Sequence, residues 1–258
     1  MRNILAVAGK ELRAYFHSPI GYLVLTLYTV LCGYFFYRLT AFVVVQTFRM
    51  QMSEGGMPPL SLNEYIVRPL FAGILTVMMV LFLIPLISMR LYAEEKRTGT
   101  MELLLTSPLT DIEIILGKFF GAMALYMVMV LLTFLDIGLL FLYGNPDAKP
   151  LIANAAGFIL LGGALIALGM WVSSFTKNQI IAAAVSAALF LLLYVFDWVS
   201  EFSSTTLDRV MSYMALPTHF DNFTKGVIDS SDLVYYLSLI VLGVFLTARS
   251  VEALKGRP

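Results

Sequence analysis

The sequence predicts an all-α integral membrane protein with six transmembrane helices. Of its 258 residues, 59% are hydrophobic and 13% are charged, and the mean hydropathy is +0.85. Soluble domains have about 25% charged and about 45–50% apolar residues, so this composition is typical of membrane proteins. Six runs approach the length of about 20 apolar residues that crosses a bilayer. Because irregular backbone cannot face lipid, each run is expected to be a helix.

A single transmembrane domain is expected over residues 1–258. Its predicted spans are 20–37, 69–89, 117–143, 151–173, 179–199 and 233–248. The last run is short, and it reaches full length only if Asp232 and Arg249 flank it at the interfaces. Gly117 and Gly121 form a GxxxG motif at the start of the third span, where small residues let another helix approach closely. That helix belongs either to the same chain or to another subunit.

The segment before the first span predicts an amphipathic helix. At about 100° per residue, its larger apolar side chains gather on one face, with Lys10, Arg13 and His17 on the other. Ser18 and Pro19 are expected to end this helix. It is expected to lie in the inner membrane interface, and an ordinary cytosolic helix is the alternative. The apolar face comprises Ile4, Leu5, Ala8, Leu12, Tyr15 and Phe16.

Two long connections are expected on the outer side. Residues 38–68 contain Gly55-Gly56 and Pro58-Pro59, which predict a flexible loop with turns. Residues 200–232 show a helix-like recurrence of apolar residues, which predicts short helices that dip toward the membrane without crossing it. A broken seventh span is the alternative, and the charged side chains there make it costly. They are Asp208, Arg209, Asp221 and Lys225.

The distribution of basic residues predicts that both termini are cytoplasmic. With the N-terminus inside, eleven of the 17 lysines and arginines fall in the inner segments and six in the outer ones. An excess of Lys and Arg marks the cytoplasmic side of a membrane protein. The six outer residues are Arg38, Arg49, Arg68, Lys149, Arg209 and Lys225.

The sequence lacks the motifs that several kinds of chemistry require. The net charge is zero, which gives no support to nucleic-acid binding. Cys32 is the single cysteine, and the two histidines are His17 and His219, so a disulfide framework or a cluster of thiolate or histidine metal ligands is not expected. No phosphate-binding GxxxxGK[ST] loop, HExxH or GxSxG motif occurs. The sequence therefore predicts no catalytic, cofactor-binding or metal-ligating residue.

Two acidic residues lie in or near the spans. Asp136 falls within the third span, where an ionisable side chain is a functional hypothesis by default. It could belong to a proton relay, line a substrate path, or bond to a Thr, Asn or Tyr side chain of a neighbouring helix. Asp197 lies near the outer end of the fifth span and is expected at the interface.

A polar segment from Met89 to Lys118 separates the second and third spans, and its sequence is MRLYAEEKRTGTMELLLTSPLTDIEIILGK. Pro85 could kink the second span just before it. Thr100 could cap a short helix over residues 101–105, with Asp111 opening the next helix. Such a helix would expose apolar side chains unless a soluble partner covers it. Those side chains are Met101, Leu104 and Leu105.

This segment resembles the signature of ABC-2-type transporter permeases, the membrane subunits of one class of ATP-driven exporters. The likeness is to the branch that includes gliding-motility and nitrous-oxide-reductase-maturation permeases. It extends to a second stretch at residues 216–229, LPTHFDNFTKGVID. Together with the six-span layout and the N-terminal helix, the resemblance covers nearly the whole chain.

The resemblance implies that the loop 90–117 carries a coupling helix, which fits a cleft on a separate P-loop ATPase subunit. The turn between the fourth and fifth spans, which contains Lys177, would be a smaller contact. The implied ATPase-coupling residues are Glu94, Glu95, Arg97, Thr98, Gly99, Thr100, Glu102, Leu104, Leu105, Pro108 and Lys177.

The resemblance also implies the assembly. Two ATPase subunits, which bind ATP and Mg, would join two permease chains in the bacterial inner membrane, in contact with lipid. The permeases could be identical or different, and the second and fifth spans would face each other across the pathway. The substrate is not indicated.

Two other functions remain as alternatives to an exporter permease. One is a membrane scaffold or assembly subunit that docks an ATPase without moving a solute. The other is a secondary carrier, which the lack of paired charges within the spans and of clear inverted repeats disfavours.

Overall fold

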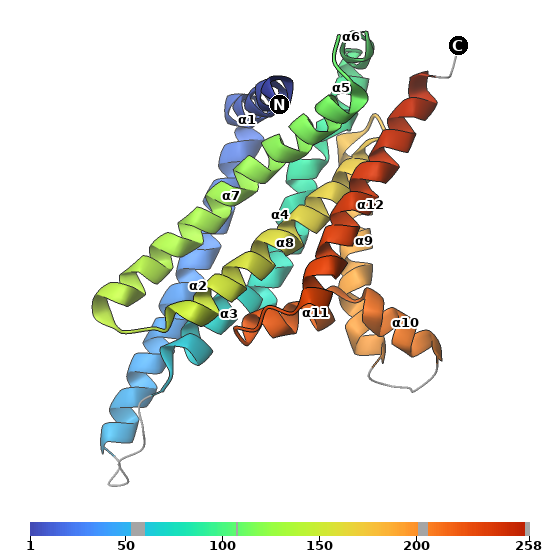
Figure 1. Ribbon diagram of the computed structural model, residues 1–258. Coiled ribbons are helices and arrows are strands. Elements are labelled where there is room, and N and C mark those ends of the chain that lie inside the picture. Colours follow the sequence, from blue (N-terminus) through green and yellow to red (C-terminus); the bar gives the residue numbers. More distant parts are fainter. Residues whose placement is uncertain (53–59, 107, 201–205, 256–258) are drawn as a thin grey trace.

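The computed structural model describes residues 1–52, 60–106, 108–200 and 206–255, and within them the chain is helical and contains no strand (Figure 1). Six helical segments in this part of the chain are long and apolar enough to cross a membrane. The prediction of an all-α membrane protein with six spans is therefore confirmed.

Five of the six spans are single helices, and the second is a series of shorter ones. The single helices are α2 (Pro19–Met52), α7 (Asp111–Tyr143), α8 (Ala148–Ser173), α9 (Gln179–Ser200) and α12 (Ser230–Lys255). The second span consists of the π-helical turn η1 (Asn63–Val67), α3 (Arg68–Ala72), α4 (Ile74–Ser88) and α5 (Arg90–Thr98).

Within the described ranges, four further helices lie outside the spans. They are α1 (Arg2–His17), α6 (Met101–Leu105), α10 (Thr206–Met214) and α11 (Leu216–Thr224). The helix before the first span thus ends at Ser18-Pro19, as predicted. Short helices also occupy the described part of the connection between the fifth and sixth spans, as predicted.

Helix α8 is the centre of the bundle, and it packs against α4, α7, α9, α11 and α12. Its glycines allow this close approach. A Cβ atom at Gly162 would lie 2.1 Å from the ring of Tyr126, and one at Gly157 would lie 2.5 Å from Phe223. Small residues let helices pack tightly in lipid, where apolar burial alone does not drive association.

The first span is much longer than the sequence predicted. Residues 38–52, which we expected in a loop, continue helix α2. The segment AFVVV at residues 41–45 is apolar and holds no helix breaker, and the first strong breakers are Gly55-Gly56. These glycines and Pro58-Pro59 lie outside the described residues.

The second span is interrupted at two places. At Gly73 the backbone is extended, with φ −60° and ψ 141°, and this residue separates α3 from α4. A Cβ atom there would lie 2.2 Å from the carbonyl oxygen of Pro69, so a larger residue would not fit. The other interruption is Met89, four residues after Pro85, where we expected a kink. The break at Gly73 was not predicted.

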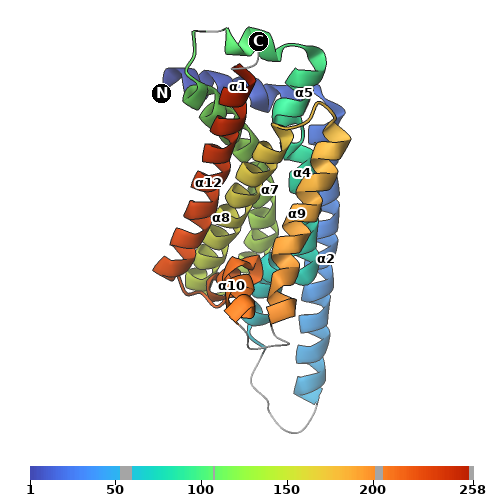
Figure 2. The ribbon, with the colours of Figure 1, turned by 90° about the vertical axis from the view of Figure 1, so that its right-hand side faces the viewer.

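The two ends of the bundle differ in structure. Helix α1, α6, the α8–α9 turn and the end of α12 lie at one end, which we call the α6 end (Figures 1 and 2). Helices α10 and α11 lie at the opposite end, which we call the α11 end. Both terminal helices therefore reach the same end, as an even number of spans requires.

A buried polar cluster fixes α11 against the start of α12. The two ring nitrogens of His219 lie 2.7 Å from Asp232 Oδ1 and 3.0 Å from the carbonyl oxygen of Tyr213. Asn222 donates to the other oxygen of Asp232 at 2.7 Å, and the imidazole stacks on Tyr235 with 3.9 Å between ring centroids. Asp232 therefore anchors α11 and does not simply mark the start of the last span.

Candidate functional site

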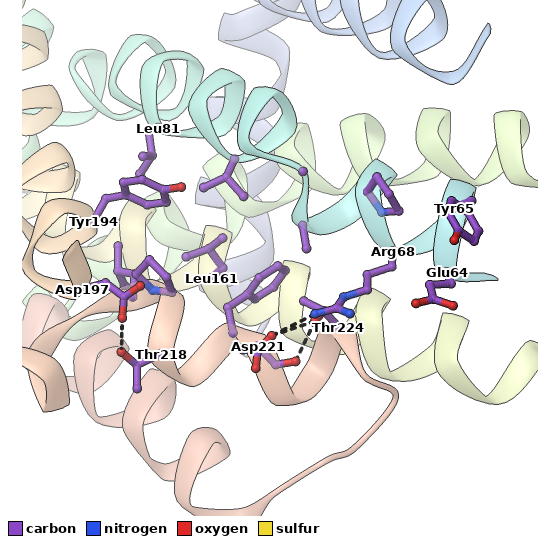
Figure 3. A pocket seen from close by; sticks show the side chains of 17 residues that line it. Glu64, Tyr65, Arg68, Leu81, Leu161, Tyr194, Asp197, Thr218, Asp221 and Thr224 are labelled. Carbon is purple, nitrogen blue, oxygen red and sulfur yellow. Dashed lines mark hydrogen bonds and ion pairs between the residues drawn. The ribbon is translucent and has the colours of Figure 1, made fainter. Parts of the chain in front are cut away.

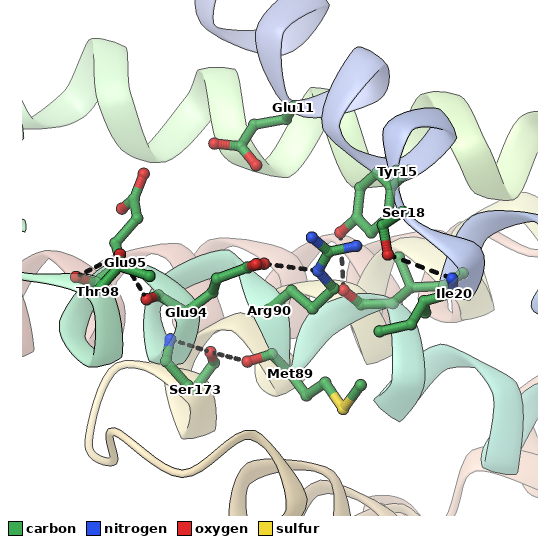
Figure 4. A network of polar contacts seen from close by, with 12 residues as sticks. Glu11, Tyr15, Ser18, Ile20, Met89, Arg90, Glu94, Glu95, Thr98 and Ser173 are labelled. Carbon is green, nitrogen blue, oxygen red and sulfur yellow. Dashed lines mark hydrogen bonds and ion pairs between the residues drawn. The ribbon is translucent and has the colours of Figure 1, made fainter. Parts of the chain in front are cut away.

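The candidate site is built from α5 and α6, which project from the α6 end. Helix α5 starts immediately after the break at Met89, so its first backbone N–H groups lack partners within the helix. Ser173, the last residue of α8, supplies them: its Oγ accepts from the N–H groups of Tyr92 and Ala93, at 3.1 Å each. The same hydroxyl donates to the carbonyl oxygen of Met89 at 2.8 Å (Figure 4). Helix α8 thus holds the start of α5.

Helix α1 contacts the same break from the other side. The hydroxyl of Tyr15 donates to the carbonyl oxygen of Ile87 at 2.7 Å. Burial raises the pKa of the Tyr15 hydroxyl well above its ordinary value, so it remains a neutral donor at neutral pH. The guanidinium of Arg90 lies over the ring of Tyr15, 5.7 Å from its centroid, and pairs with Glu94 at 2.6 Å (Figure 4).

Lys118 connects three helices. Its ammonium nitrogen lies 2.8 Å from Glu11 of α1 and 2.8 Å from Glu95 of α5, and its side chain is 1% exposed. Lys10 lies 3.6 Å from the same oxygen of Glu95. In a site of low dielectric, ion pairs of this kind are strong and costly to break singly. The pairs tie α1, α5 and α7 into one unit.

The GxxxG motif of α7 receives α1. A Cβ atom at Gly117 would lie 2.5 Å from Cβ of Val7, and one at Gly121 would lie 2.6 Å from Cβ of Glu11. Of the two partners that we considered for this motif, the structure shows a helix of the same chain. The face of α1 that packs on Gly117 and Gly121 includes the charged residue Glu11. Its charge is tolerated there because Lys118 of α7 lies close enough to pair with it.

A left-handed turn joins α5 to α6. Gly99 has φ +73°, a conformation that residues with a Cβ rarely adopt. The turn places α6 at the outermost point of this end, where Leu103 is 72% exposed (Figure 1). Met101, which we expected to be exposed, is 7% exposed and packs into the core. Thr100 is the N-cap residue of α6, as predicted, but its side chain contacts the Thr98 hydroxyl at 3.0 Å and makes no capping hydrogen bond.

The turn between α8 and α9 lies beside α5. Lys96 donates to the carbonyl oxygen of Ser174, and the Ser174 hydroxyl lies 2.7 Å from that of Ser250 in α12. Lys177, further along this turn, is exposed. The two connections that we expected to face an ATPase therefore lie at the same end and touch each other.

The predicted coupling residues fall into two groups. Glu94 and Glu95 point back into the bundle and form the ion pairs described above, and Leu104 packs partly against the core. The side chain of Leu105 lies outside the described residues. The exposed members at the α6 end are Arg97, Thr98, Gly99, Thr100, Glu102, Pro108 and Lys177.

Asp136 lies apart from this group. It is half-buried in α7, on the side of that helix that faces Cys32 of α2. The hydroxyls of Tyr28 and Thr133, 2.6 Å apart, belong to the same α2–α7 contact. The roles that we considered for Asp136 stay predictions.

Sequence reasoning did not identify four residues that hold α5 in place, which are Glu11, Tyr15, Lys118 and Ser173. The sequence could have indicated a role for Lys118, because an ionisable residue within a GxxxG motif at the start of a span needs a partner. The partners themselves lie 107 and 23 positions away in the chain and could not be paired from spacing alone.

These features define a polytopic helical membrane protein with a projecting helix at one end. The chain belongs to the ABC-2 family: the family model described as "ABC-2 family transporter protein" matches residues 5–247, nearly the whole chain. The match confirms the resemblance drawn from the sequence and gives the chain a permease role in ABC transport, as a membrane transport component. No curated protein matches the chain.

Proposed function

We propose that the chain is the permease subunit of an ABC exporter and that the exposed surface of α5, α6 and the α8–α9 turn docks a separate ATPase. The ATPase would bind ATP and Mg, and two copies would act on two permease chains. The α6 end would then face the bacterial cytoplasm, with both termini on that side.

The main support for the proposal is that α5, which continues into α6, is attached to three other helices, α1, α7 and α8. A displacement of α6 passes through Gly99 to α5, which Ser173 links to α8 and Lys118 links to α1 and α7. Packed helices joined in this way move as units between discrete arrangements. An ATPase that pushes on α6 would therefore shift the inner ends of the second and third spans together.

The test uses two substitutions on the docking surface. Gly99→Pro removes the left-handed turn, since proline fixes φ near −65°. Glu102→Lys reverses a charge that is exposed on α6. We expect each to weaken ATPase co-purification by about tenfold or more, which corresponds to about 1.4 kcal/mol, and to abolish permease-dependent ATP hydrolysis in proteoliposomes.

Glu252→Lys is the matched control, because Glu252 is an exposed acid of α12 outside this surface. It should leave ATPase binding unchanged. Equal ATPase binding and activity in the wild type and in both docking variants would refute the docking assignment. Substrate movement in ATP-loaded vesicles would separate an exporter from a scaffold that only docks an ATPase.

A further inference from the structure

The α11 end contains a cavity of about 740 Å³ between the second span, α8, α9 and α11. This volume falls in the range of small-molecule sites, which is about 300–1,000 Å³. Figure 3 shows Arg68, Asp221 and Thr224 on one side and Tyr194, Asp197 and Thr218 on the other.

The break in the second span opens onto this cavity. Gly73, with its extended backbone, belongs to the lining, as do Pro69 and Ala72 at the end of α3. Irregular backbone at membrane depth is tolerated where it is covered by protein or lines a cavity. The cavity therefore coincides with the place where the span departs from a continuous helix.

The lining is apolar inside and polar at its edge. Val77 and Leu81 of α4 and Leu161 of α8 are buried and form its apolar part. The polar part is fixed by hydrogen bonds and ion pairs: Thr218 donates to Asp197 at 2.8 Å, and Arg68 lies 3.2 Å from Asp221. Such a lining suits a ligand with an apolar body and a polar head.

The charges of the lining indicate whether the polar head of the ligand would be a cation or an anion. Three carboxylates line the cavity, those of Glu64, Asp197 and Asp221, against the single guanidinium of Arg68. Arg68 is engaged with Asp221, which also pairs with Lys225, so it offers little to an anion. Even with Lys225 included, acids outnumber bases by three to two, and an excess of one charge within low-dielectric walls concentrates ions of the opposite sign.

Two tyrosines add to this preference. Tyr65 of η1 and Tyr194 of α9 line the cavity, and the ring of Tyr194 packs on Trp198 with centroids 6.3 Å apart. Aromatic faces attract cations, most strongly where water is excluded. We propose that this cavity binds an organic cation with an apolar body, which rests on the proposed export function and assigns it a ligand class.

The test compares two probes of nearly the same shape and opposite charge, tetraphenylphosphonium and tetraphenylborate. Binding is measured by equilibrium dialysis on the full chain in phosphatidylcholine nanodiscs, with empty nanodiscs subtracted. We expect the cation to bind at one site per chain and about tenfold more tightly than the anion. Anion binding that is equal or tighter, or no cation binding above empty nanodiscs, would overturn the proposal.

Three variants locate the site. Asp197→Asn, which keeps the side-chain shape, should weaken cation binding about tenfold. Ala72→Leu should weaken both probes, because the added side chain enters the cavity. Asp147→Asn removes an exposed charge near this end but outside the lining, and should change neither. Unchanged cation binding in Asp197→Asn or in Ala72→Leu would show that the cation binds elsewhere.

The same variants separate the two proposals. Co-purification with the ATPase should be normal in Asp197→Asn and Ala72→Leu, because α11, which lines the cavity, lies at the end opposite α6. Loss of cation binding with intact ATPase docking concerns the cavity alone. Intact cation binding in a chain that docks no ATPase would refute the proposed function and leave the binding site in place.

Discussion

At the scale of single residues, Lys118 connects three helices at the α6 end. Its two carboxylate partners come from different helices, and the ring of Tyr92 lies 5.2 Å from its ammonium nitrogen. An ammonium group that is 1% exposed is stable only while these partners compensate its lost hydration. This side chain therefore reports on whether α1, α5 and α7 are correctly assembled.

Lys118→Met should destabilise the protein by about 3–5 kcal/mol, because it leaves Glu11 without its cation and Glu95 with only the exposed Lys10 at 3.6 Å. The measurement is thermal unfolding of the purified protein in detergent. Replacing Lys118, Glu11 and Glu95 together by methionine should recover much of the loss, since an apolar cluster of similar volume needs no compensating charge. If the single variant unfolds at the wild-type temperature, the three residues do not form a buried ion-pair cluster.

At the scale of elements, hydropathy predicted the existence and order of the helices better than their lengths. Apolar runs are a direct consequence of the bilayer, so all six spans were found from the sequence. The extension of α2 to Met52 was missed, because a helix can continue beyond the membrane wherever no breaker stops it. The break at Gly73 was missed because a single glycine in an apolar run does not show that the helix stops there, and its contact with Phe35 of α2 forms only in the folded bundle.

The candidate site was predicted to a similar degree. The turn at Gly99 and the projection of α6 follow from local sequence, and Arg97 and Glu102 are exposed as a docking role requires. The inward orientation of Glu94 and Glu95 was not foreseen, because a charged run gives no sign of which members find partners in another helix. For Glu95 the partner is Lys118 of α7, whereas Glu94 pairs with Arg90 one turn earlier in α5, and Arg90 in turn lies over Tyr15 of α1.

Gly117→Leu should displace α1 from α7. Any side chain at Gly117 meets Val7, with the first added carbon already at 2.5 Å, so the helices must separate. Because the ion pair between Glu11 and Lys118 depends on this contact, a detached α1 should unfold more easily, and trypsin should cleave faster at its exposed Lys10 and Arg13. We expect cleavage in inside-out vesicles to be about tenfold faster or more. A tenfold change corresponds to a loss of about 1.4 kcal/mol in the free energy that holds α1 against α7.

Gly138→Leu on the same helix is the control, because a Cβ atom there meets nothing within 4 Å. It should leave the cleavage rate unchanged. A second check is Gly117→Ala combined with Val7→Gly, which restores the space and should return cleavage to the wild-type rate. Equal cleavage in Gly117→Leu and Gly138→Leu would mean that the groove does not hold α1.

At the scale of the whole molecule, the two ends are built for different tasks. The α6 end carries exposed polar side chains on α5 and α6, joined by buried ion pairs to the helices behind them. The α11 end has the cavity and the cluster around His219 and Asp232, which holds α11 in place as one wall of that cavity. Helix α8 runs between the two ends, so a movement started at α6 has a continuous path to the cavity wall.

The orientation of these ends can be tested with single cysteines. Lys177 and Asp147 are exposed and lie just beyond the two ends of α8, a helix of 26 residues. Its length is about 39 Å at 1.5 Å per residue, which exceeds the hydrocarbon core of about 30 Å, so the two positions should face opposite compartments. The natural Cys32 is buried and should give little background labelling.

With the α6 end in the cytoplasm, Asp147→Cys should react almost completely with a membrane-impermeant maleimide in intact spheroplasts. Lys177→Cys should stay near the background of the parent chain until the membrane is permeabilised. Labelling both variants in permeabilised membranes controls for reactivity, because each thiol should then react. The opposite pattern would place α6 outside the cell, where no ATP is available, and would remove the physical basis for ATPase docking at this end.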